Sequence, residues 1–138
     1  MEPNALPQVI QVFIAASNKP DPDAYIDCFS EDALIFDEGK VWAGKSAIRK
    51  WSAEHHFDAN VTLDLQRHRQ DQGEITAVFK VDGDFDKTSL PNPLYLDFYF
   101  QIHNHKIKQL AIQLSKGPEQ TETLIKVRNQ EEHKNDSK

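Results

Sequence analysis

The chain has 138 residues, of which 38% are hydrophobic and 28% charged, and its formal net charge is −6. This length suits one domain with a buried core. The acidic balance and the lack of a lysine and arginine stripe argue against nucleic acid as a partner, and no apolar run approaches the ~20 residues of a membrane span. The single cysteine, Cys28, cannot form an internal disulfide, and the N-terminus does not have the pattern of a signal peptide. We therefore expect a cytoplasmic protein.

Two helices are expected at the N-terminus. Apolar residues between Leu6 and Ile14 recur at helical spacing, and the polar segment 18–20 ends the pattern. The sequence Asp21-Pro22-Asp23 is typical of a capped helix start, with proline at the first helical position and an acidic first turn. A short second helix is therefore predicted over Pro22–Phe29.

A hairpin and a third helix follow. Ala33–Asp37 and Lys40–Ala43 are predicted strands, and the glycine between them supplies the turn. The third helix begins after Gly44, and its inner face carries Ile48, Trp51 and His55.

From residue 59 the hydrophobic period changes to two, which predicts four longer strands. They lie around residues 61–66, 75–81, 94–102 and 107–114, and a polar loop at 82–93 precedes the third of them. Three helices interleaved with two short strands, and then an antiparallel meander, predict an α+β fold with about six strands in a mixed or antiparallel sheet. Residues 1–116 form this predicted domain, and the charged segment 117–138 is a tail expected to be partly helical or disordered.

The strand around residues 94–100 has apolar or aromatic side chains on both faces. One face carries Leu94, Leu96, Phe98 and Phe100, and the other carries Tyr95, Asp97 and Tyr99. A sheet with one solvated face would alternate apolar with polar residues, so both faces should be covered. We expect the leucine and phenylalanine face to lie outside in a homodimer contact, and Asp97 to point inward.

Five short motifs of the chain form a recognisable set: Phe13–Asn18, Asp23, Cys28–Ala33, Asp37 and Gly44–Trp51. Together they resemble the SnoaL-like members of the nuclear-transport-factor-like (NTF2-like) superfamily, to which the ketosteroid isomerases and polyketide cyclases also belong. The resemblance covers roughly residues 6–114, and it implies a strongly bent sheet wrapped around the helices, a deep internal pocket, and dimerisation through the outer sheet face.

Two carboxylates are candidate catalytic groups. The isomerase pattern places its general base at Asp37 and a neutral, hydrogen-bond-donating carboxylic acid at Asp97. Burial in an apolar run should raise the pKa of Asp97. The alternatives are a simple turn residue for Asp37 and a structural Asp97 bonded to arginine or a backbone amide. The tyrosine of the isomerase pattern is replaced by Phe13, so a true ketosteroid isomerase is not expected.

The other expected pocket residues are mostly aromatic or apolar, and they include the two residues, Phe29 and Ser52, at the positions of the isomerase's supporting hydroxyls. His56 is expected to point away from the side of His55, because adjacent residues of an α-helix diverge by about 100°. Neither a metal site nor a cofactor is expected. The predicted function is a cofactor-independent isomerase, lyase or cyclase acting on a small carbonyl compound. A ligand-binding module without turnover and a protein-interaction adaptor remain alternatives. The expected lining is Phe13, Tyr25, Phe29, Trp51, Ser52, His55, Tyr99, Leu110, Ile112 and Leu114.

Overall fold

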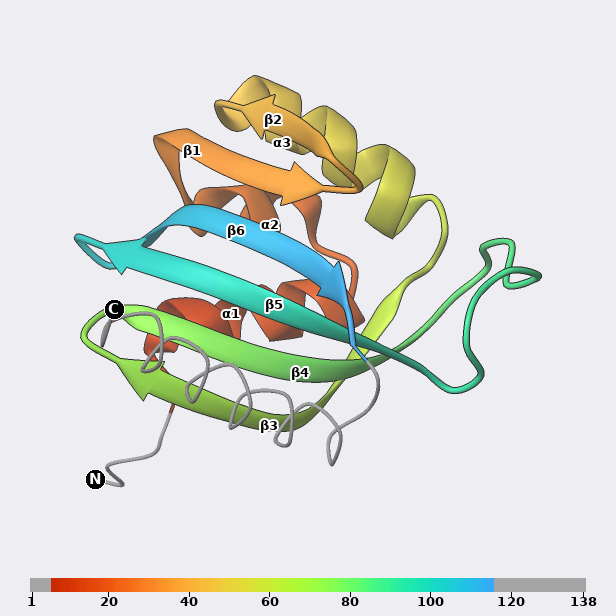
Figure 1. Ribbon diagram of the computed structural model, residues 1–138. Helices are drawn as coiled ribbons and strands as arrows, with labels where there is room; N and C mark the ends of the chain where they lie inside the picture. Colours follow the sequence, from red (N-terminus) through yellow and green to blue (C-terminus); the bar gives the residue numbers. More distant parts are fainter. Residues whose placement is uncertain (1–5, 116–138) are drawn as a thin grey trace, which may run out of the picture.

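Three helices and six strands make up the computed structural model, which describes residues 6–115 (Figure 1). Among the described residues, no helix has the length and apolar character needed to cross a membrane. The helices are α1 (Gln8–Asn18), α2 (Pro22–Asp27) and α3 (Lys45–Ser52), and α3 continues into a π-helical turn, η1 (Ala53–Phe57). The strands are β1 (Phe29–Asp37), β2 (Lys40–Ala43), β3 (Thr62–Asp71), β4 (Glu74–Asp82), β5 (Leu94–His103) and β6 (Lys106–Leu114).

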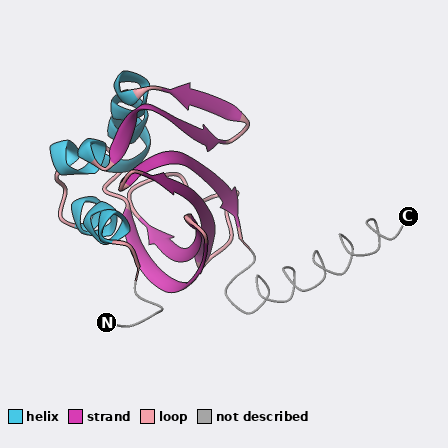
Figure 2. Ribbon diagram, turned by 90° about the vertical axis from the view of Figure 1, so that its left-hand side faces the viewer, coloured by secondary structure: helices cyan, strands magenta, loops and turns pink. Residues whose placement is uncertain are grey.

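The six strands form one mixed sheet in the order β2-β1-β6-β5-β4-β3. All neighbouring strands are antiparallel except β1 and β6, which are parallel. The sheet curves strongly, and the helices lie on one side of it (Figure 2). The predicted α+β architecture of three helices and a curved six-stranded sheet is therefore confirmed.

The second helix is shorter than predicted, because the chain enters the sheet early. Asp21 caps α2 as expected, since its side-chain Oδ1 accepts a hydrogen bond from the backbone N–H of Ala24 at 3.2 Å. The helix then ends at Asp27 instead of Phe29. The cause is the parallel ladder, in which the Cys28 carbonyl accepts from the N–H of Ile107 at 2.8 Å and Phe29 pairs with β6.

Aromatic side chains of α1 and β5 meet in the core. The Phe13 ring lies 6.3 Å from Phe98 and 5.3 Å from Phe100, measured between centroids, in edge-to-face geometry. Phe98 and Phe100 are therefore on the helix side of the sheet. The prediction that the leucine and phenylalanine face of β5 lies outside is wrong, because burying these side chains against α1 removes more apolar surface from water than burying the face of Tyr95 would.

The β1–β2 hairpin turns at two residues with positive φ, as the glycine in the sequence predicted. Glu38 has φ 52° and Gly39 has φ 76°, which is the left-handed backbone of a two-residue hairpin turn. This turn fixes where β1 ends, and so places Asp37 at the rim of the curved sheet.

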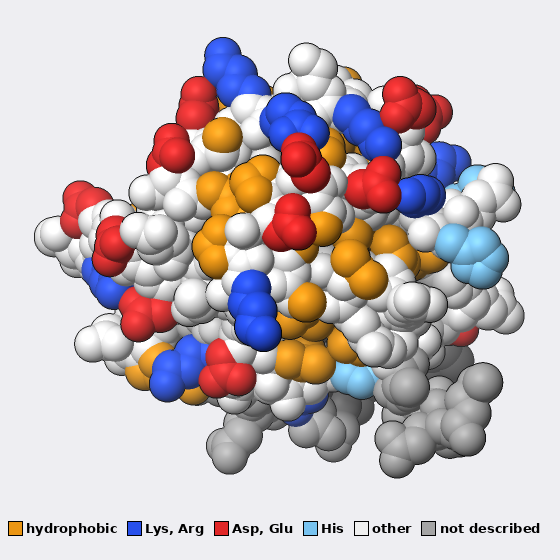
Figure 3. All heavy atoms as spheres, turned by 180° about the vertical axis from the view of Figure 1, so that it is seen from behind, with side chains coloured by type: hydrophobic (Ala, Val, Ile, Leu, Met, Phe, Trp, Pro, Cys, Tyr) orange, Lys and Arg blue, Asp and Glu red, His pale blue; other side chains and the backbone are white. Residues whose placement is uncertain are grey.

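Acidic and basic side chains alternate on the helix side of the molecule, where neither sign forms a continuous stripe (Figure 3). The surface seen there is therefore unlike the basic stripe of a nucleic-acid-binding face.

Candidate functional site

A cavity of about 670 Å³ lies between the curved sheet and the segment that runs from α3 into η1. This volume is within the range of small-molecule sites. Its wall comes from α2, β1, α3, η1, the strands β3 to β6 and the loop after β4. It is lined by Tyr25, Asp37, Glu38, Gly39, Trp51, Glu54, His55, His56, Ala59, Val61, Leu63, Val81, Phe85, Asp86, Leu90, Leu94, Leu96, Phe98, Ile112, Gln113 and Leu114.

Asp37 is the partly buried carboxylate of this cavity. Its Oδ2 accepts a hydrogen bond from the indole N–H of Trp51 at 3.1 Å. Burial raises the pKa of Asp37, the charge of Glu38 raises it further, and the Trp51 hydrogen bond and His55 act in the opposite direction. A carboxylate that is desolvated but held in place by one neutral donor is a stronger proton acceptor than a free one.

Tyr25 and His56 form a neutral aromatic wall. Their rings stack at 5.4 Å between centroids and 28° between planes. Burial raises the pKa of Tyr25 well above its ordinary value, and the charges of Cys28 and Asp37 raise it further. Burial lowers the pKa of His56 against the effect of its hydrogen bond to the Ser17 carbonyl. Tyr25 therefore keeps its proton at neutral pH and can donate a hydrogen bond.

The turn η1 places both His55 and His56 at the cavity. The prediction that His56 points away from the side of His55 is therefore wrong. The backbone N–H of Asp58 donates a hydrogen bond to the Ala53 carbonyl at 2.8 Å, and the backbone N–H of Val61 donates one to the His56 carbonyl. Each of these hydrogen bonds joins residues five positions apart, as in a π-helix. This wider turn lowers the angle between adjacent side chains below the 100° of an α-helix. His55 and His56 consequently both line the cavity.

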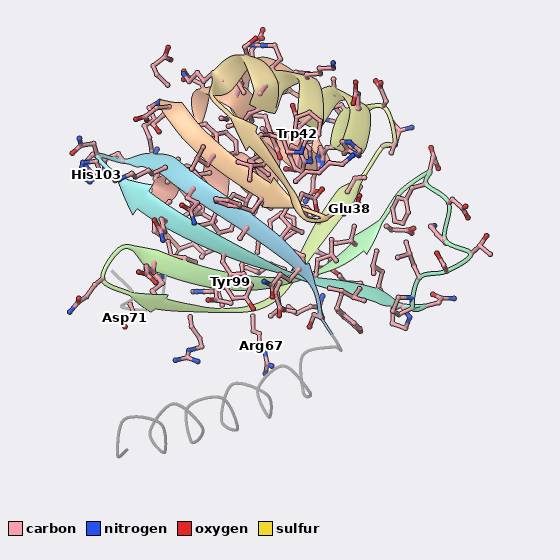
Figure 4. The ribbon with its side chains drawn as sticks, turned by 45° about the horizontal axis from the view of Figure 1, so that its top comes forward. Glu38, Trp42, Arg67, Asp71, Tyr99 and His103 are labelled. Carbon is pink, nitrogen blue, oxygen red and sulfur yellow. The ribbon has the colours of Figure 1, made fainter. Side chains whose placement is uncertain are left out.

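Three exposed carboxylates line the cavity at its mouth. Glu38 comes from the β1–β2 turn, and Glu54 lies on η1 with its Oε2 3.9 Å from His55 Nε2. The His55 ring also lies 6.0 Å from the ring of Trp42 on β2. Figure 4 shows Glu38 at the hairpin turn and Trp42 beside α3. Asp86 reaches the mouth from the loop between β4 and β5.

Asp97 does not line the cavity, so the prediction that it points inward is wrong. It pairs across the sheet with Val78 and Gln113, on the face opposite Phe98, and the Tyr99 hydroxyl donates to its Oδ2 at 3.3 Å. Figure 4 shows Tyr99 and Arg67 on the side of the sheet away from the helices. Because successive side chains of a strand point to opposite faces, the inward placement of Phe98 puts Asp97 and Tyr99 outside the expected site.

Six predicted residues do come together at the cavity: Asp37, Tyr25, Trp51, His55, Ile112 and Leu114. Phe13, Phe29 and Leu110 are fully buried core residues that do not reach it. The Ser52 hydroxyl donates to the Arg49 carbonyl at 3.0 Å and is likewise absent from the lining.

Sequence reasoning missed the contribution of β3, β4 and the following loop. The alternation of Leu63 and Val81 predicted inward-facing positions, but not that they line a cavity instead of filling a core. Phe85 and Leu90 belong to a polar loop that has no regular hydrophobic period. Their apolar character was the one feature of this loop that could have indicated a place in the cavity wall.

Within residues 6–115, no group of three or more His, Cys, Asp or Glu side chains is arranged to hold a metal ion. The histidines of η1 are oriented by ring contacts with Trp42, Trp51, Tyr25 and Phe57. Both histidines are therefore part of the cavity wall.

Comparison with solved structures finds several proteins of the same architecture. A candidate polyketide cyclase from Sinorhizobium meliloti superposes with a TM-score of 0.71 at 28% identity, over 78% of this chain and 95% of that one. An NTF2-like protein from Cytophaga hutchinsonii gives 0.66 at 9% identity, over 83% and 95%. A protein with a ketosteroid isomerase-like fold from Catenulispora acidiphila, in complex with trimethylamine, gives 0.64 at 18% identity, over 81% and 88%. No family model matches the sequence, and no curated protein matches it.

These neighbours define the class of protein: the chain has the cone-shaped fold of the NTF2-like superfamily. Polyketide cyclase and ketosteroid isomerase-like proteins are among them, so the resemblance to the SnoaL-like branch is confirmed.

Proposed function

We propose that the protein is a cofactor-independent isomerase, lyase or cyclase that acts on a small carbonyl compound, with Asp37 as the general base. The observation that carries the proposal is the Asp37 carboxylate, partly buried at a mostly apolar cavity and held by the Trp51 indole N–H at 3.1 Å. A base in such a site has both a raised affinity for protons and a fixed orientation.

In the proposed reaction, Asp37 takes a proton from the carbon next to the substrate carbonyl, and the electron pair of that C–H bond moves into an enolate. The negative charge then develops on the carbonyl oxygen. Tyr25 supplies a hydrogen bond to this oxygen, in place of the Asp97 of the sequence-based hypothesis, because the phenol stays protonated and lies at the same cavity. Asp37 can afterwards return the proton to another carbon of the same substrate.

The fold neighbours support a small-molecule pocket. They include candidate polyketide cyclases and a candidate ketosteroid isomerase, and one neighbour holds trimethylamine. A ligand-binding module without turnover is the second candidate, because the placement of Asp97 on the other face removes one of the two expected catalytic carboxylates.

Deuterium uptake at the α-carbon of small cyclic ketones in D₂O, followed by NMR, tests the base. We expect the native protein to accelerate uptake for at least one ketone, and D37N to lose about 10²–10⁴-fold of that acceleration. D32N is the matched control, since Asp32 is an exposed aspartate on the same strand and does not line the cavity.

Uptake that is equal in D37N and the native protein would contradict Asp37 as the base. Ketones that bind without any accelerated uptake would favour the binding module.

The expected homodimer also belongs to the proposal. Its original basis, an outward-facing Phe98 and Phe100, is wrong, but the outer sheet face still carries half-buried Phe36, Tyr95 and Tyr99. We propose this face as the contact between two copies of the chain.

A further inference from the structure

The charged residues that line the cavity have one sign. Four carboxylates line it, and neither lysine nor arginine is among its lining residues in the described part of the chain. The two histidines are the other titratable nitrogen groups, and burial lowers the pKa of His56, which favours its neutral form. The four carboxylates are Asp37, Glu38, Glu54 and Asp86.

The nearest lysine of the bordering loop is turned toward another partner. Lys87 Nζ lies 2.6 Å from Asp82 Oδ1 and 5.4 Å from the centre of the Phe85 ring. Asp86 accepts a hydrogen bond from the backbone N–H of Thr88 at 3.0 Å, and this donor carries no charge. Asp37 likewise has an indole N–H, which carries no charge, as its hydrogen-bond donor.

The remaining wall is apolar and aromatic. Trp51, Phe98 and Phe85 contribute aromatic rings, and leucine, isoleucine and valine side chains fill the spaces between them. Such a wall has a low local dielectric, so the partly buried Asp37 acts on a ligand charge more strongly than it would in water, whereas the exposed Glu38, Glu54 and Asp86 act through solvent. Aromatic faces add a further attraction for cations.

From the charges and aromatic rings together we infer that the ligand of this cavity has an apolar body and a positively charged amine, with the amine held at the mouth near Glu38, Glu54 and Asp86. The inference rests on the proposed function, because it names the substrate class of the same site. An anionic ligand would meet four like charges without a compensating cation, which disfavours carboxylates and phosphates. The overall charge of −6 attracts the same class of ligand at long range.

Three probes with the same ring and different charges test the inference: benzyltrimethylammonium, benzyl alcohol and phenylacetate. Calorimetric or NMR titration at low salt measures each dissociation constant. We expect the cation to bind at least about tenfold more tightly than phenylacetate, and the preference to shrink as salt screens the mouth carboxylates.

A charge-matched pair of variants locates the effect. E38Q/E54Q/D86N removes three mouth carboxylates, and D32N/D58N/D64N removes three that do not line the cavity. Both changes raise the net charge by the same amount. We expect the first variant to lose most of the cation preference and the second to keep it.

Phenylacetate binding that equals or exceeds cation binding would overturn the inference, as would the absence of cation binding up to about 10 mM. An equal loss of preference in both variants would also overturn it, since the effect would then come from net charge alone. None of these results bears on the ketone exchange assay, which depends on Asp37. Failure of the cation assignment and failure of the general base are therefore distinguishable.

Discussion

Two elements of the fold hold Asp37 at the cavity. Asp37 ends β1 just before the glycine turn, and Trp51 of α3 donates its indole N–H to the carboxylate. This placement also takes part of the carboxylate out of water, which has a consequence for stability.

Asp37 should lower the stability of the protein at neutral pH, because burial raises its pKa in the folded state. For an acid with a raised folded pKa, the native state binds more protons than the unfolded state between the two pKa values, so stability falls as the pH rises through this window. Stability is greatest below the pKa of the aspartate in the unfolded chain, which is about 3.9. An asparagine side chain at this position cannot ionise and avoids this loss.

We therefore expect D37N to melt at a higher temperature than the native protein near pH 8, with a smaller difference near pH 4. Thermal melts at the two pH values measure it, with D32N as the control that shows no such change. A melting temperature that does not differ between D37N and the native protein at either pH would mean that the folded structure imposes no such cost on the Asp37 charge.

At the scale of elements, periodicity predicted helices and strands well and side-chain direction less well. The stripe in α1 and the alternation in β4 each left one obviously apolar face. In β5 both faces are rich in large apolar or aromatic side chains, so parity could not decide which one packs on α1. The π-helical turn η1 has no sequence period of its own, and an α-helical spacing wrongly separated His55 from His56.

The η1 turn should make the protein sensitive to mild acid through His56. Burial lowers the pKa of this histidine below its ordinary 6.5, so the unfolded state binds more protons once the pH falls beneath that value. The stability it contributes is complete above about pH 6.5 and is lost progressively as the pH falls toward the lowered folded pKa.

We expect the melting temperature of H56Q to fall less between pH 7 and pH 5 than that of the native protein. H55Q changes the adjacent, exposed histidine of the same turn and should keep the native slope. Equal slopes for H56Q and the native protein would show that His56 does not resist protonation in the folded state.

For the whole molecule, the order of elements predicted the α+β class, and the family resemblance predicted the curved sheet. Helices interleaved with a short hairpin and followed by a meander favour one layer of helices packed against one sheet. The parallel pairing of β1 with β6 joins the β1–β2 hairpin to the long strands of the sheet. It connects segments more than 70 residues apart in the sequence, so local sequence patterns do not predict it. The predicted tail, 117–138, lies outside the described residues and stays a prediction.

The outer face of the sheet is the surface on which a second copy should dock. Ala111 is at the centre of this face, because its register partners are Phe36 on β1 and Tyr99 on β5. Side chains at these positions are half-buried, and a contact between two such faces would remove the rings of Phe36, Tyr95 and Tyr99 from water. A small residue at the centre lets two sheets approach closely.

We expect the native protein to sediment as a dimer at micromolar concentration and A111R to sediment as a monomer, since arginine would place two like charges against each other at the two-fold contact. V12R is the matched control, because Val12 is 39% exposed on α1, on the helix side of the molecule. It should remain dimeric. A native protein that sediments as a monomer, or an A111R variant that remains a dimer, would exclude this face as the contact.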